Sequence, residues 1–276
     1  MAYDNFIPEI WSKKIEKDLE RICVYAEDCN RQYEGSVKQC GDTVHILGSG
    51  KPTIHTLARS SASGDIAGPE EVEGTDTVMV IDQIRYFNFK VGDIDKAQAV
   101  NGVLDALTDE ANEGLANEVD VHIASMVSGA GHTEEEDALT ESNILDVLDN
   151  AQQKLYEADV KPTTEVVVVL PPAVYKLFRK AYITKDTDNS DMLKNGKVAK
   201  YANMTVKLSN NVNKTGNTYN MMMRTKRAVA YAQPLRHVEP YRPEGSFADA
   251  VKGFILFGAK VVRPKEMVKV AVTLAA

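Results

Sequence analysis

A long polar excursion between two strand-like runs is the feature that most restricts how this chain can fold. Residues 58–76, ARSSASGDIAGPEEVEGTD, are small or acidic and have little to bury, which predicts an exposed loop tip. Before them Val44 and Ile46 alternate with polar residues. After them residues 77–91 are rich in β-branched and aromatic side chains, and a shift of the apolar phase near Asp82 indicates a bulge. We therefore expect a two-stranded arm, and because two strands are marginal alone in water, the arm should lie on a neighbouring subunit.

The decapeptide HILGSGKPTI, residues 45–54, has part of the pattern of a phosphate-binding loop. That loop requires a glycine at its first position and a hydroxyl residue after the lysine to ligate magnesium. Here the first position is His45, and Lys51 is followed by Pro52. The stretch instead predicts a hairpin turn, with a return strand at residues 53–57.

Two segments have the apolar period of amphipathic helices. In residues 8–26 apolar side chains recur at spacings of three and four. From residue 93 to 126 one face stays apolar, which predicts a spine helix of roughly 50 Å. A break is expected at residues 129–137, and Thr140 is the expected N-cap of a second helix.

The second half of the chain alternates strand and helix patterns, which predicts an α/β arrangement. The run VVVVL at Val166–Leu170 is an expected buried strand, and Pro-Pro after it opens a short helix. Residues 182–198 are polar and predict a loop. Further strands are expected at residues 204–208, 221–224 and 228–232, and on either side of Arg263 and Pro264.

Charge is distributed unevenly along the chain. Residues 93–160 contain 17 acidic and 2 basic residues, a net charge of −15, whereas residues 161–276 contain 20 basic and 8 acidic residues, a net charge of +12. This polarity favours contact between the acidic segment of one copy and the basic segment of another, or a surface that repels anions. Solvated helix faces explain it equally well.

The chain lacks the residue groupings of a catalytic, cofactor or metal site. Glu118 and His122 lie one helical turn apart, but no second pair is present, so a local or solvated pair is favoured over a metal site. The acidic run at 134–137 lacks the ligand spacing and the glycine of a calcium loop and predicts a solvated linker. The three cysteines form no CxxC pair and are expected to be reduced. No signal sequence or membrane span is evident, so we expect a soluble cytosolic protein with no membrane partner.

Four pieces of the chain, in their order and spacing, are similar to one known family. They are NFIPEIWSKKI near the N-terminus, YEGSVKQCGDTVHI before the excursion, VMVIDQIRYFNFKVGDIDKAQA after it, and GFILFGAKVVRPKEMVKVAV near the end. Together they resemble the major capsid proteins of tailed bacteriophages, which share the Hong Kong phage type of capsid fold. The resemblance implies an α+β fold with an N-terminal arm, an extended β-hairpin loop, a long spine helix in a peripheral domain and an α/β axial domain.

The resemblance also implies a division of the chain and a structural, non-enzymatic function. Residues 1–33 would form the N-terminal arm, 34–91 the extended loop lying across the adjacent subunit, 92–160 with 237–276 the peripheral domain, and 161–236 the axial domain. Copies would form the hexamers and pentamers of an icosahedral shell around double-stranded DNA. The implied partners are other copies of the chain, a separate scaffolding protein, a portal and, through non-specific contact, the packaged DNA. The chain would lie in the virion capsid, and in the host cytoplasm during assembly.

The candidate contact residues lie mainly in the N-terminal segment and the extended loop. Contacts between subunits are expected at Trp11, Ile15, Lys51, Arg59, Glu70, Glu71, Glu73 and Arg85. Asp109, Glu110 and Glu113 are expected on an inward-facing acidic surface that keeps DNA from adhering to the wall. Two alternatives stay open: a shell protein of a non-viral encapsulating compartment with the same fold, and a non-specific nucleic-acid-binding protein that uses the basic C-terminal third.

Overall fold

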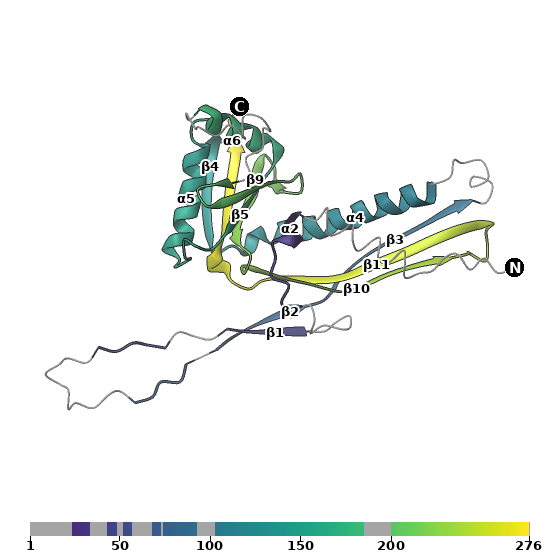
Figure 1. Ribbon diagram of the computed structural model, residues 1–276, viewed down its shortest axis with the longest axis horizontal. Coiled ribbons are helices and arrows are strands. Elements are labelled where there is room, and N and C mark those ends of the chain that lie inside the picture. The colour runs from purple at the N-terminus through teal and green to yellow at the C-terminus, as the bar shows by residue number, and fades with distance from the viewer. Residues whose placement is uncertain are drawn as a thin grey trace.

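The computed structural model describes residues 24–33, 43–48, 52–56, 68–72, 74–92, 103–184 and 200–275. Within these ranges the chain forms a body around a large sheet, an elongated body of three strands and a long helix, and an arm that projects away from both (Figure 1). Most of the expected helix at residues 8–26 lies outside the described residues.

The first body is built on a mixed seven-stranded sheet. Its strands run in the order β4 (His132–Leu139), β12 (Met267–Leu274), β9 (Thr218–Thr225), β5 (Val166–Leu170), β7 (Met204–Leu208) and β6 (Lys200–Tyr201), and β8 (Asn213–Thr215) pairs with β9. Helix α5 (Ile144–Glu157) packs on β4 and β12, and α6 (Pro172–Thr184) packs against α5. Every residue of β5 is buried, as its unbroken apolar sequence predicts.

The second body is an antiparallel sheet of β10 (Val229–Tyr241), β11 (Ala248–Val261) and β3 (Gln83–Gly92), with α4 (Val103–Ser125) along one face (Figure 1). Leu115, Val119 and Ile123 of α4 are buried in one cluster with Ile255 and Phe257 of β11. Their spacing of four residues places them on one side of the helix. The predicted spine helix is confirmed from Val103 onward, and after Ser125 it continues as a 3-10 turn, η3 (Met126–Gly129).

The arm starts from a short antiparallel ladder of β1 (Thr43–Gly48) and β2 (Thr75–Val80). Inward-facing side chains of this ladder pack on β10 and β11 in a second small core made of Val44, Ile46, Met79, Ile81, Ala230, Ala232 and Leu256. At the crossing, a Cβ on Gly258 would lie 2.6 Å from the carbonyl oxygen of Val80. Glycine therefore permits the close approach of β11 to the root of the arm.

Two expectations about the arm are wrong. Residues 52–56 form no strand, and β1 pairs with β2 instead of turning back at the GSG sequence. The expected strand at 77–91 is two strands, because the chain leaves the arm at Ile81 and Asp82 and enters the three-stranded sheet as β3. The shift of apolar phase at Asp82 therefore reflects a change of sheet and not a bulge.

Two expectations about residues 129–143 are also wrong. The predicted solvated linker at 134–137 is part of β4, a parallel edge strand on β12 whose side chains alternate in exposure. The N-cap position of α5 is Asn143 and not Thr140, because the helix begins at Ile144; the Asn143 Oδ1 accepts hydrogen bonds from the backbone and hydroxyl of Thr140 and makes no capping bond. Both features depend on pairing with distant residues or on a local side-chain network that periodicity does not detect.

Strands of the large sheet come from more than one of the segments into which the sequence is expected to divide. The large sheet joins β4 and β12, which come from the segments 92–160 and 237–276, to strands of the segment 161–236. The boundaries between N-terminal arm, extended loop, peripheral and axial domains therefore stay a proposal. Among the helices that the structure describes, none has both the length and the apolar character needed to cross a bilayer.

Candidate assembly surfaces

Residues 24–33, which we call the strap, lie where the two bodies meet. The strap begins with the short helix α2 (Val24–Glu27), seen beside α4 in Figure 1. Arg224 of β9 is only 2% exposed and donates through Nη1 to the carbonyl oxygen of Asp28 (2.6 Å) and through Nη2 to that of Tyr25 (2.8 Å). A buried guanidinium needs such acceptors, because a buried charge without partners is very costly.

Asp120 of α4 holds the start of the strap. Its two carboxylate oxygens accept hydrogen bonds from the backbone N–H groups of Val24 and Tyr25, each at 3.2 Å. Burial raises the pKa of Asp120 to about 6, although these hydrogen bonds oppose the rise. Burial likewise raises the pKa of the Tyr25 phenol, and the Asp120 carboxylate adds to that effect.

The end of the strap is tied to β7 and β10. The ammonium group of Lys207 lies 2.7 Å from Asp28 and 2.9 Å from Glu27. Burial lowers the pKa of Lys207, but the hydrogen bonds to these two carboxylates outweigh it, so the pKa is raised. Asn30 exchanges backbone hydrogen bonds with β10, donating to Val229 (2.9 Å) and accepting from Tyr231 (3.0 Å). The strap is thus fixed to both bodies by charges and backbone bonds.

The face of the three-stranded sheet opposite α4 is only partly covered. The root of the arm covers Leu256, but its cross-strand neighbours Ile84 and Leu235 remain exposed, and so does Tyr86 two residues farther along β3, at 77%. Tyr86, His237 and Phe254 line an apolar depression of about 350 Å³. Hydrogen bonds and ion pairs border it, including Lys252 to Glu239 at 3.1 Å. An apolar patch with a polar rim is typical of a protein-binding surface.

The arm also exposes apolar side chains. On the outer side of its ladder Leu47 is 80% exposed, with Val78 and Val80 nearby on β2. Farther out, Ile54 is 92% exposed and Val72 is also exposed. Because a single copy leaves these groups in water, the arm has the character of a segment that is covered by another chain.

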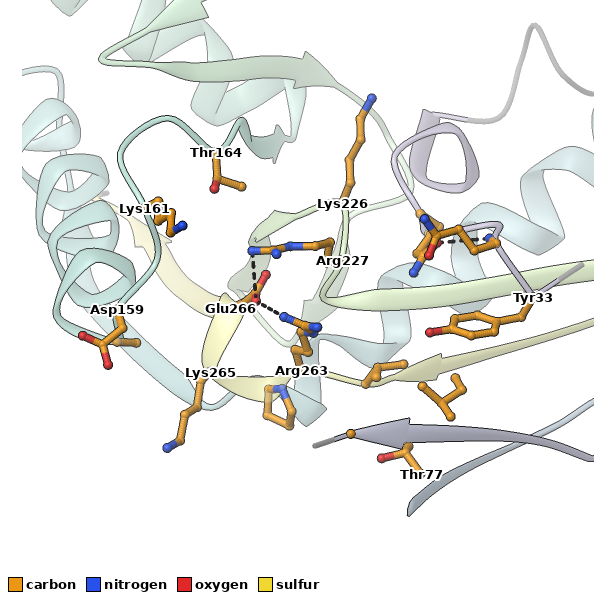
Figure 2. A pocket seen from close by; sticks show the side chains of 18 of the residues that line it. Tyr33, Thr77, Asp159, Lys161, Thr164, Lys226, Arg227, Arg263, Lys265 and Glu266 are labelled. Carbon is orange, nitrogen blue, oxygen red and sulfur yellow. Dashed lines mark hydrogen bonds and ion pairs between the residues drawn. The ribbon is translucent and has the colours of Figure 1, made fainter. Parts of the chain in front are cut away.

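A basin of about 1130 Å³ lies where the strap, the arm root and the two bodies meet (Figure 2). Six cationic side chains line its wall. Five come from three connections: Lys161 after α5, Lys226 and Arg227 between β9 and β10, and Arg263 and Lys265 between β11 and β12, and the sixth is Arg31 of the strap. Apolar and aromatic residues of the strap and the arm root, such as Tyr33 and Ile46, complete it. We call this site the basin.

Glu266 organises the centre of the basin. Its carboxylate lies 3.4 Å from Arg227 and 2.9 Å from Arg263 and accepts a hydrogen bond from the Thr225 hydroxyl at 2.5 Å. Figure 2 shows both guanidinium groups turned toward it. Among the described residues, Lys161 and Lys265 have no carboxylate partner, and both are exposed. Glu266 thus fixes Arg227 and Arg263, and Lys226 lies 4.0 Å from Asp28, whereas Lys161 and Lys265 are available to bind an anionic group.

The expected contact residues are found in different settings. Glu70 and Glu71 are exposed on the arm, and Glu70 accepts a hydrogen bond from the backbone of Thr53 (2.9 Å). Arg85 pairs with Glu118 of its own chain, Nε to Oε2 at 3.2 Å. The remaining expected contact residues, Trp11, Ile15, Lys51, Arg59 and Glu73, lie outside the described residues.

The expected acidic surface is only partly formed on one side of α4. Glu110 and Glu113 are exposed, but Asp109 is half-buried. The candidate pair of Glu118 and His122 does not form: Glu118 binds Arg85, and the His122 ring packs edge-on against Phe257 with centroids 5.3 Å apart. Burial and the nearby Arg85 lower the pKa of His122. In the described part of the chain, no three His, Cys, Asp or Glu side chains gather as a metal site.

Sequence reasoning missed the strap anchors and the basin. Arg224 had one local signal, since a lone arginine in the buried run MMMRT must find acceptors inside the protein. Asp120 looked like one of many acids on a long helix, and the basin residues lie in three connections far apart in the sequence. No spacing rule predicts their approach.

Comparison with solved structures defines the class of this fold. A structure from Mycobacterium phage Che8 is 26% identical and matches 98% of each chain with a TM-score of 0.77. The capsid of cyanophage P-SCSP1u is 14% identical over 87% of this chain and 85% of that chain, with a TM-score of 0.70. A virus-like particle from Pyrococcus furiosus is 11% identical over 95% and 98%, with a TM-score of 0.58.

No protein-family model and no curated protein matches the chain. The structural matches nevertheless show that the chain has the fold of phage major capsid proteins, which confirms the expected α+β capsid fold. The chain is therefore a protein of the capsid-shell class.

Arg224 allows a direct test of the strap. Replacing it by Met leaves the carbonyl groups of Tyr25 and Asp28 buried without a donor, so we expect the free energy of unfolding to fall by about 2–5 kcal/mol. Urea unfolding of the purified chain measures this loss. The control is Arg179→Met on the exposed side of α6, which should change stability by less than about 0.5 kcal/mol. Equal stability of the two variants would show that Arg224 does not anchor the strap.

Asp120 predicts a pH dependence with a definite sign. Because its folded pKa of about 6 exceeds the ordinary value of 3.8, the folded chain holds more protons between these values, and this carboxyl's contribution to stability is lost as the pH rises through 6. We expect the difference in unfolding free energy between the wild type and Asp120→Asn to be larger at pH 4.5 than at pH 7. Urea titrations at both pH values test this, with Asp137→Asn on the exposed edge of β4 as control. A difference that stays constant or grows toward pH 7 would contradict it.

Proposed function

We propose that this chain is the major capsid protein of a tailed bacteriophage, with hexamers and pentamers forming an icosahedral shell around double-stranded DNA. Its role is structural and not enzymatic, and its place is the virion capsid, with assembly in the host cytoplasm. The similarity over 98% of both chains to the structure from Mycobacterium phage Che8 supports the class, and the arm supports assembly.

The exposed arm is the observation that carries this proposal. Its ladder has only two strands, and Leu47, Ile54 and Val72 stay in water in a single copy. A two-stranded ribbon with exposed apolar side chains is marginal alone, and a neighbouring subunit would bury those groups. Arm ordering and assembly would then be coupled by mass action.

The proposal includes partners besides other copies of the chain. A separate scaffolding protein would direct closure of the shell, and a portal would occupy one vertex. Glu110 and Glu113 of α4 would face the interior with Asp109 beside them, where negative charge limits adhesion of packaged DNA. The domain division proposed from the sequence and the contacts at Arg85, Glu70 and Glu71 belong to the same proposal.

A shell without a genome is the second candidate. The similarity to the virus-like particle from Pyrococcus furiosus, over 95% of this chain, favours it. Particles that form from this chain and enclose protein cargo rather than DNA would decide for this candidate.

Removal of the arm tests the function. Gly48 and Thr75 are paired at the end of the ladder, so residues 49–74 can be replaced by Asn-Gly to close a two-residue hairpin. We expect the shortened chain to keep the two bodies folded but to form no closed shells. Sedimentation and negative-stain microscopy, with and without a candidate scaffolding protein, provide the measurement. The control replaces the same residues by a 26-residue Gly-Ser segment; closed shells from the shortened chain would contradict the proposed role of the arm.

The acidic surface makes a separate prediction. We expect Glu110→Lys with Glu113→Lys to leave shell formation intact but to lower DNA packaging or release, because the inner wall would attract phosphates. Particle yield and DNA content per particle are the two readouts. Loss of the particles themselves would show that this side of α4 is a contact between subunits and not an inner surface.

A further inference from the structure

We propose that the basin is the receptor for the acidic outer part of the arm of a neighbouring copy. This inference rests on the proposed shell function and names the surface that receives the arm. The stretch that would enter is around residues 68–72, GPEEV, which the structure describes on the returning side of the arm.

The two surfaces are complementary in charge. Between residues 60 and 84 the chain has six acidic residues and no lysine or arginine. The basin presents six cationic side chains, and the exposed Lys161 and Lys265 lack a carboxylate partner among the described residues. Glu71 is exposed on the arm and, among the described residues, has no basic partner in its own chain. Each surface thus offers charge that the other lacks.

The two surfaces are also complementary in apolar character. Val72 of the arm is exposed next to Glu70 and Glu71. The basin has an apolar side wall, to which Leu47 and Val262 contribute. A segment that carries carboxylates beside an apolar side chain can therefore use both kinds of wall.

Geometry requires that the arm come from another copy. The basin includes Leu47, Gly48 and Thr77 at the root of its own arm. The described segments 52–56 and 68–72 continue outward from that root, away from both bodies (Figure 1). Since each copy has the basin at the root and the acids farther out, a head-to-tail contact can repeat from copy to copy around a closed ring.

Nucleic acid fits the basin less well than the arm does. Glu157, Asp159 and Glu266 lie among its cations and would repel a phosphate chain. A phosphate backbone would also leave the apolar wall without a partner. A peptide with separated carboxylates can place them on Lys161 and Lys265 and avoid the acids.

Charge exchange between the two surfaces tests the proposal. The variants are Glu71→Lys, Lys265→Glu and the combination of both, and the control is Lys176→Glu, an equal charge change on the exposed side of α6. We expect each single reversal to lower particle yield about ten-fold, because the repulsion recurs at every contact, and the combined variant to restore most of the yield. Normal yields from both single variants, or no recovery in the combined variant, would overturn the proposal.

Crosslinking tests contact directly. Wild-type particles made from isotopically light and heavy chains are treated with a carbodiimide, which joins a carboxylate to an amine in contact. We expect amide links from Glu70 or Glu71 of one copy to Lys161, Lys226 or Lys265 of another. Links confined to one copy, or links of the basin lysines only to other acids, would overturn it.

A peptide measurement separates this proposal from the proposed function. A labelled peptide of residues 68–76 should bind the soluble chain and lose about ten-fold in affinity with Lys265→Glu. If the chain forms no particles but binds the peptide in this way, the shell function fails and the basin assignment holds. If particles form but the peptide binds both proteins equally or neither, the basin assignment fails and the shell function holds. If a DNA oligonucleotide displaces the peptide and binds the basin more tightly than the peptide does, the basin is a phosphate-binding site and the proposal is overturned.

Discussion

The fold depends on the buried contact between Arg224 and the strap. Through two carbonyl groups this arginine fixes residues 24–33 to the large sheet, while Asp120 fixes the same residues to α4. Asn30 then joins the edge of β10, and Lys207 binds the acids of the strap. Because one short segment satisfies buried charges from both bodies, neither body can move away without exposing unpaired polar groups. The strap also forms part of the wall of the basin.

A single copy leaves its arm incomplete. The small core under β1 and β2 fixes only the root, and beyond Gly48 and Thr75 the described segments make no further ladder. Apolar groups on the arm and around Tyr86 remain in water. Association with other copies would cover these apolar groups and so lower the free energy. This gain is the thermodynamic basis of a shell built from many copies.

The edges of the large sheet show the opposite tendency. On β4 Glu135 and Asp137 are exposed, and Lys154 of α5 binds Glu134. Charged side chains along an edge strand oppose pairing with another strand. The acidic run that looked like a linker thus protects one edge, whereas the arm and the basin stay open to partners.

The sequence by itself determined the elements whose signal is local. The apolar period fixed α4, the run VVVVL fixed β5, and the order of four pieces indicated the capsid fold. Tertiary structure alone decided which strands pair: β1 joins β2 and not residues 53–56, residues 77–91 divide between two sheets, and residues 132–139 become a strand by pairing with β12. The acceptors of Arg224 and the approach of Lys161, Arg227 and Lys265 were likewise decided by the fold. Helical periodicity depends on neighbours a few residues apart, but sheet pairing, buried charge satisfaction and basin formation depend on residues brought together across the whole chain.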